Sequence, residues 1–217
     1  MFCHRHLEVV DEYVYLGVVF NYNGSFTEAI DKQLTQGKKA YYALLSKVYK
    51  LRLPVDISLE MFNYLVLPVL LYGCKVWGYS NIEHIEILYR KCIKTLLKVN
   101  MNTPNVMVYG ETGTFPIVNH INIRIINFYA RIVSGKQTKL SFILYKLTRK
   151  KQELENMYNS KWLNMIESNL AFMGMNDLWL NEGMGFYPLY IKEAFKRRQN
   201  DSSIQDWKAD VVNHDYC

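Results

Sequence analysis

The sequence predicts a mainly α-helical protein with one small β-hairpin at its N-terminus. Apolar side chains recur every three or four residues over most of the 217-residue chain, which is the period of an amphipathic helix. Residues 7–20 are instead rich in β-branched and aromatic side chains, as strands are. No internal repeat or low-complexity tract is present. Half of the residues are apolar, which is enough for a core and excludes a disordered chain.

The N-terminal part of the chain predicts a hairpin followed by a long helix. The strand-like region breaks at Asp11-Glu12, which favours a hairpin turn there over a metal site. Ser25 and Glu28 have the spacing of a capping box, so the helix should begin beside them and end before Pro54. Gly37 lies within its apolar face and should let a neighbouring helix approach closely. That face consists of Ile30, Leu34, Gly37, Tyr41, Leu44, Leu45 and Val48.

The remainder of the chain predicts further helices. The one that begins at Ser58 and extends to Trp77 is apolar on most sides, so we expect it to be buried and kinked at Pro68. The others are expected over 81–99, 116–133, 139–158, 159–173 and 188–210, with a short helical or turn segment over 103–110 and a looser stretch over 174–188.

The sequence gives no sign of a membrane or secretory protein. Its longest apolar run, Tyr64–Tyr72, is well short of the roughly 20 residues that span a bilayer. Residues 1–6 lack the apolar stretch of a signal peptide. The cysteines are widely spaced, which favours reduced thiols; they are Cys3, Cys74, Cys92 and Cys217. We therefore expect an intracellular chain, in the nucleus or the cytoplasm, with no membrane partner.

No pattern of catalytic residues is evident, so no catalytic residue, metal or cofactor is predicted. The paired aspartates of two-metal enzymes, a phosphate-binding glycine loop and a Gly-x-Ser-x-Gly elbow are all absent. Cys3-His4-Arg5-His6 lacks the further ligands that a zinc site needs. Cys74 and Cys92 lie on apolar faces and should belong to the core. His84 and His120 have no acid or nucleophile at a suitable spacing and are expected to be solvated or capping.

The positive charge of the chain is clustered. The net charge is +6, and acid-free basic runs cover 32–52, 90–98 and 136–151. Such clusters favour binding to nucleic-acid phosphates, although a basic stripe is also the ordinary solvated face of a helix. Tyr41, Tyr42 and Tyr49 alternate with lysines, which fits base stacking or core packing. The candidate binding residues are Lys32, Lys38, Lys39, Lys47, Lys50, Arg90, Lys91 and Lys94.

Four stretches of the chain each contain a short sequence motif. The stretches are residues 12–44, 67–78, 85–133 and 195–211, and their motif residues are Tyr15, Leu16, Gly17, Pro68, Leu71, Tyr72, Gly73, Trp77, Thr103, Pro104, Asn105, Glu111, Gly113, Pro116, Gln205, Asp206 and Trp207. Together they resemble the region that follows the catalytic palm in reverse transcriptases of LINE-type, non-LTR retrotransposons. The resemblance covers most of the chain.

The resemblance implies a helical thumb and connector bundle with a small hairpin left from a palm sheet. It assigns 1–24 to the end of the palm, 25–135 to thumb and connector helices, and 136–217 to a C-terminal helical region. The family's aromatic-x-Asp-Asp motif lies upstream of the Tyr-Leu-Gly strand and is absent here, so polymerase activity is carried over to no residue. The implied thumb role is contact with the backbone of RNA or an RNA–DNA hybrid.

Three interpretations follow from these observations. The first is a truncated, catalytically silent reverse-transcriptase-like protein that binds nucleic-acid backbone without sequence preference. The second is a helical protein-interaction or scaffold module whose basic faces only keep it dissolved. The third is the tail of a longer gene product with its catalytic half upstream. In the first interpretation the N-terminal strands lack their partners from the palm sheet, and their exposed edges would favour self-association.

Overall fold

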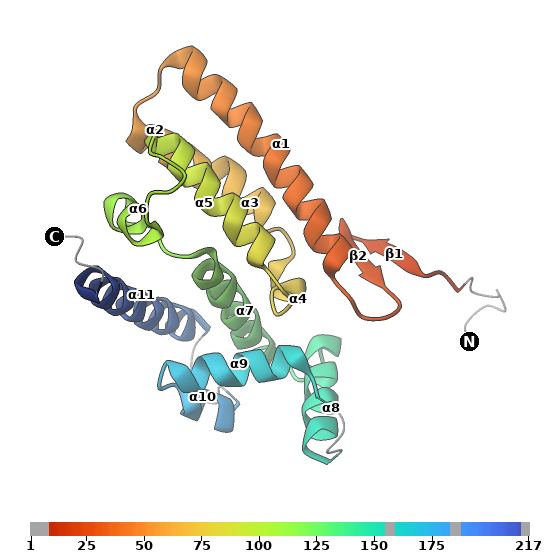
Figure 1. Cartoon of the computed structure of the whole chain (residues 1–217). Coiled ribbons are helices and arrows are strands. Elements are labelled where there is room, and N and C mark those ends of the chain that lie inside the picture. Colours follow the sequence, from red (N-terminus) through yellow and green to blue (C-terminus); the bar gives the residue numbers. More distant parts are fainter. Residues whose placement is uncertain (1–8, 155–158, 183–187, 214–217) are drawn as a thin grey trace. The chain divides into compact units, whose positions relative to one another are not determined.

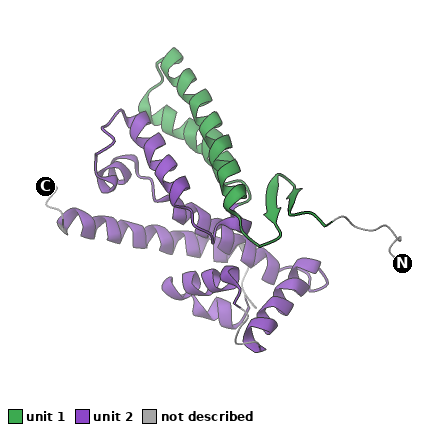
Figure 2. Cartoon of the chain, turned by 45° about the vertical axis from the view of Figure 1, so that its right-hand side comes forward, with its two compact units in different colours: residues 1–73 green, residues 74–217 purple. Residues whose placement is uncertain are grey.

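The computed structural model describes residues 9–154, 159–182 and 188–213 (Figure 1). It confirms a mainly α-helical chain with a small N-terminal hairpin. The chain divides into two compact units, residues 1–73 and 74–217 (Figure 2). The boundaries at 24 and 135 that the resemblance implies stay a prediction. No helix among the described residues is long and apolar enough to cross a membrane.

The hairpin consists of β1, Glu12–Tyr15, and β2, Val18–Asn21, paired antiparallel with Tyr15 opposite Val18. The predicted turn at Asp11-Glu12 is wrong, because the chain reverses at Leu16-Gly17. Both turn residues have positive φ, 47° and 82°, as a two-residue turn matched to strand twist requires. The Tyr72 hydroxyl donates to the Leu16 carbonyl at 2.6 Å and fastens the turn to the rest of the unit.

Helix α1, Thr27–Leu51, is the longest element of the first unit. Its predicted apolar face is buried apart from Leu45, which is half-buried. Gly37 allows the predicted close approach, since a Cβ there would lie 2.6 Å from Leu70 Cδ1. The predicted capping box is wrong: the helix begins after Phe26 without a side-chain cap, and the Ser25 hydroxyl instead accepts a bond from the Thr27 N–H.

The predicted helix from Ser58 to Trp77 is continuous over Val55–Leu70, with one π-helical turn, and is interrupted at residues 71–73, where Gly73 has φ 71°. Its parts are α2, Val55–Met61; a π-helical turn η1, Phe62–Val66; α3, Leu67–Leu70; and, in the second unit, α4, Cys74–Trp77. The π turn directly precedes α3, where Pro68 occupies the first turn and needs no backbone donor. The prediction that this segment is buried on most sides is also wrong, because Tyr64, Leu65 and Tyr72 are 73%, 50% and 49% exposed.

The second unit is built around α7, Ile117–Val133, which contacts most of its other helices. Those helices are α4; α5, Glu83–Leu97; α6, Asn105–Thr112; α8, Leu140–Leu154; α9, Lys161–Phe172; α10, Asn176–Leu180; and α11, Pro188–Asn213. Helices α5, α7, α8, α9 and α11 fall where helices were predicted, and α6 falls near the predicted segment over 103–110; residues 155–158 lie outside the described part. Helix α10 was not predicted, because it lies in the stretch over 174–188 that was expected to be looser. Trp77, Tyr89, Tyr129 and Phe195 are the largest wholly buried side chains of this unit.

Candidate nucleic-acid interface

The solvated face of α1 carries the largest group of predicted binding residues. Lys38, Lys39, Lys47 and Lys50 are exposed and Lys32 is half-buried. No acid occurs between Asp31 and the end of the helix, and none of these lysines forms an ion pair with another described residue. At 1.5 Å per residue, Lys32 and Lys50 are separated by about 27 Å of helix axis. At 100° per residue Lys32, Lys39 and Lys50 lie within about 20° of one another on one side of the helix, whereas Lys38 and Lys47 lie on its two flanks. The helix carries no acid after Asp31.

The tyrosines of α1 divide between its two faces. Tyr41 is 3% exposed and meets the Phe62 ring edge-on, with 6.5 Å between centroids. Tyr42 and Tyr49 are both 58% exposed and, at seven residues apart, lie about two helical turns from one another. Stacking on Tyr42 or Tyr49 is thus sterically open, whereas Tyr41 serves the core.

The basic run on α5 is largely used by the fold. Lys94 is only 8% exposed, and its ammonium donates to the Met101 carbonyl at 2.9 Å. Burial, reinforced by Arg90, lowers the pKa of Lys94. Arg90 lies 3.9 Å from the Glu86 carboxylate. In this structure Lys94 cannot reach a phosphate and Arg90 is shared with an acid, which leaves Lys91 as the freely exposed member of this predicted set.

The third basic run also has structural partners. Arg149 Nη1 donates to the Trp179 carbonyl at 3.0 Å and to Glu182 at 3.2 Å, while its guanidinium lies 4.5 Å above the Trp179 ring. Lys146 pairs with the same Glu182 carboxylate. These contacts hold α8 to the end of α10. Both cations are therefore structural.

The motif residues occupy structurally distinct positions. Tyr15 and Leu16 are exposed, a Cβ at Gly17 would lie 3.4 Å from the Tyr72 ring, and Gly73 has φ 71° at the end of the first unit. Trp77 is wholly buried in the second unit. Glu111 is exposed on α6 and has no ion pair with a described residue.

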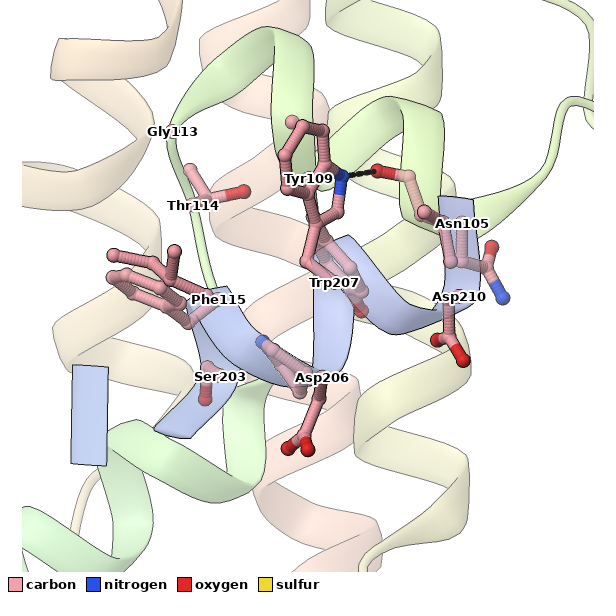
Figure 3. Close-up of a pocket in the computed structure, with 13 residues that line it drawn as sticks. Asn105, Tyr109, Gly113, Thr114, Phe115, Ser203, Asp206, Trp207 and Asp210 are labelled. Atoms are coloured by element: carbon pink, nitrogen blue, oxygen red, sulfur yellow. Dashed lines mark hydrogen bonds between the residues drawn. The ribbon is translucent and has the colours of Figure 1, made fainter. Parts of the chain in front are cut away.

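Five of the motif residues line one cavity between α6 and α11 (Figure 3): Asn105, Gly113, Pro116, Asp206 and Trp207. Its volume is about 570 Å³. Trp207 crosses from α11 to α6, where its indole Nε1 donates to the Val106 carbonyl at 2.8 Å. Gly110 makes this possible, because a Cβ there would lie 2.8 Å from the indole.

Two aromatic residues of this cavity, Tyr109 and Phe115, were not predicted from the sequence. Glu86 on α5 positions this region: one carboxylate oxygen accepts from the Tyr109 hydroxyl at 2.6 Å, the other from the Ile117 N–H at 2.8 Å. Burial and this neighbouring carboxylate raise the pKa of Tyr109, which keeps its hydroxyl a donor. The sequence contained a signal in Pro116, since a helix that begins there exposes an N–H for an acid to bind.

Among the described residues, no group of three or more His, Cys, Asp or Glu side chains is placed to hold a metal ion. Cys74 and Cys92 are buried, as predicted, and burial raises the pKa of their thiols to about 11 and about 12. Neither is therefore a thiolate nucleophile at neutral pH. His120 is not solvated: it packs against Tyr89, and burial lowers its pKa to about 4. Cys3, His4 and His6 lie outside the described residues.

Comparisons with protein-family models, with curated proteins and with solved structures find no match to this chain.

Proposed function

We propose that the chain is a catalytically silent, reverse-transcriptase-like thumb and connector region that binds the backbone of RNA or an RNA–DNA hybrid through α1. The observation that carries this proposal is the set of lysines on α1: Lys32, Lys39 and Lys50 lie along one side over about 27 Å, with Lys38 and Lys47 on the flanks. None of them has an ion-pair partner among the described residues. Phosphate neutralisation by such lysines is independent of sequence. Exposed Tyr42 and Tyr49 beside them add stacking surfaces for unpaired bases.

The sequence resemblance supports the same face. It gives the helix after the Tyr15-Leu16-Gly17 strand the role of a thumb lever against a primer–template backbone. Catalytic residues are not part of the proposal, because the family's paired aspartates have no counterpart in this sequence. Any activity of this chain on nucleic acid would thus be binding alone.

The test is fluorescence anisotropy with labelled single-stranded RNA and an RNA–DNA hybrid, from about 50 to about 500 mM salt. If the five lysines each neutralise one phosphate, log K for the hybrid should fall against log salt with a slope of about −4.5. The K38E/K39E double variant should bind at least about tenfold more weakly and with a shallower slope, because two contacts become repulsive.

The matched control is K139E/K161E, which makes the same change in net charge at exposed positions outside α1. It should retain most of the affinity. Equal losses in both double variants would show that only net charge matters, and affinity that does not change with salt would contradict phosphate binding altogether.

A second candidate function is protein interaction, including self-association. The hairpin and its support expose a set of large apolar side chains that soluble monomers seldom gather on one small element. We call this set the hairpin surface: Tyr13, Val14, Tyr15, Leu16 and Tyr72, which are 49–72% exposed. Within the described residues β1 pairs only with β2, so its outer edge is open to another strand.

Sedimentation velocity over a hundredfold range of protein concentration tests this candidate. Self-association through the hairpin surface should give a dimer at high concentration that is lost in a Y13S/Y15S variant. A monomer at all concentrations, or a dimer unchanged by these substitutions, would remove self-association from consideration.

A further inference from the structure

We propose that the cavity between α6 and α11 binds a small organic cation, an ammonium group carried on an aromatic or aliphatic body. The cavity volume of about 570 Å³ lies within the roughly 300–1,000 Å³ typical of small-molecule sites. Tyr109, Phe115 and Trp207 contribute aromatic rings to its wall, and Val106 and Ile204 contribute aliphatic groups (Figure 3). Such a lining favours an apolar body, and its rings attract a cation.

The charges of the cavity select the sign of the ligand. Its two carboxylates, Asp206 and Asp210, are one helical turn apart on α11, exposed, and without an ion pair to any described residue. Like charges at this spacing destabilise a helix. An ammonium group between them would relieve the repulsion, whereas a phosphate or carboxylate would add to it.

The order of charges along α11 points in the same direction. Its first half carries Lys192, Lys196, Arg197 and Arg198 with one acid, Glu193, and its second half carries Asp201, Asp206 and Asp210 with one lysine, Lys208. This order is the reverse of what the helix macrodipole favours, since cations are best placed near the C-terminus. Helix stability therefore does not account for the acidic end, and a cationic ligand does.

The wall of the cavity is fixed before any ligand arrives. The Trp207 indole is held by the Val106 carbonyl, and the Tyr109 hydroxyl by Glu86. Ser203 accepts a hydrogen bond from a buried amide: Asn119 Nδ2 donates to its Oγ at 2.6 Å. As an acceptor in that bond, Ser203 keeps its own hydroxyl proton for a polar group of the ligand. A site with positioned side chains loses little conformational entropy on binding.

The experiment compares phenylpropylamine, phenylpropanol and phenylpropionate, which share one aromatic body and differ in charge. Binding to the full chain is followed by the NMR signal of the Trp207 indole N–H, assigned with a W207F variant. The amine should bind about tenfold more tightly than the alcohol, and the carboxylate most weakly, as expected for one or two partly exposed charge pairs.

The D206N/D210N variant should bind the amine and the alcohol within about twofold of each other, because its cavity lacks net charge. The matched control is D201N, which removes an acid of α11 that does not line the cavity and should retain the preference for the amine. Equal binding of all three probes by the unaltered chain, binding of none at millimolar concentration, or a preference that survives D206N/D210N would overturn the proposal. The three probes are compared on the unaltered chain, so misfolding of D206N/D210N cannot obscure that comparison.

Discussion

Replacing Gly37 with alanine sets two effects of known sign against each other. Alanine is the better helix former, which alone would stabilise the middle of α1 by about 1 kcal/mol. The added methyl would, however, lie 2.6 Å from Leu70 Cδ1 and 3.5 Å from Leu70 Cβ. Leu70 is 0% exposed, so a shift of its side chain has to be accommodated by its neighbours in the core. Overpacking of this kind costs about 1–3 kcal/mol. We therefore expect a net destabilisation of about 1 kcal/mol.

Two companion variants separate the two effects. Ala43→Gly, at an exposed position of α1, should destabilise by about 1 kcal/mol and so measures helix propensity in the same helix. Leu70→Ala should cost about 2–5 kcal/mol by leaving a cavity. In the G37A/L70A double variant the new methyl fills part of that space. Its loss of stability should therefore be smaller, by about 1 kcal/mol, than the sum of the losses in the two single variants.

Urea unfolding followed by far-UV circular dichroism provides these free energies. The four tryptophans all lie in residues 74–217, so their emission reports the second unit, whereas the effect of G37A originates in the first. A G37A variant that is more stable than the parent by the full helix-propensity gain would refute the packing argument, as would strictly additive losses in the double variant.

Three further substitutions test other contacts. Burial lowers the pKa of His120 to about 4, below its unfolded value near 6.5. The unfolded chain thus binds more protons between these pH values, and stability should fall by about 2–3 kcal/mol as pH drops through that window. In H120Q the free energy of unfolding, measured by urea titration, should depend less steeply on pH. An unchanged dependence would mean that other groups cause it. Leu16 is 72% exposed and has φ 47°, a conformation that asparagine tolerates better than leucine. L16N should therefore raise the free energy of unfolding, measured by urea titration, by about 1 kcal/mol. R149K should lower the thermal midpoint, with a loss of about 1–3 kcal/mol, because lysine cannot bond Trp179 and Glu182 in one planar fork; a neutral result would mean that the Lys146–Glu182 pair suffices.

The helices of the second unit were predictable because local and tertiary signals agree there. Helix α7 begins directly after Pro116, ends at Ser134-Gly135, and buries the stripe that its apolar period indicates. At the start of α1 the signals conflict. The Ser25 N–H donates to the Asn23 side chain at 2.8 Å, so the polar residues there form successive local turns and the helix begins later than the capping box suggested.

The basic runs show what the sequence cannot reveal. Lys39, Lys94 and Arg149 look alike in a charge pattern, yet Lys39 is solvated while the other two donate to acceptors of the fold. Those acceptors are carbonyls at helix ends or in loops, and their positions are set by tertiary packing. Charge clustering therefore predicted where cations occur but not which of them remain available for phosphate.

The two functions proposed for the first unit respond to salt in opposite directions. Binding through the lysines of α1 releases counterions and weakens as salt rises. Association through the hairpin surface buries apolar groups, and excluded salts such as sulfate strengthen it. A sulfate titration that abolishes RNA binding while promoting dimers would show both surfaces at work in one chain. If RNA binding and dimerisation instead fell together, the lysines of α1 would be common to both, and the hairpin surface would not be the interface.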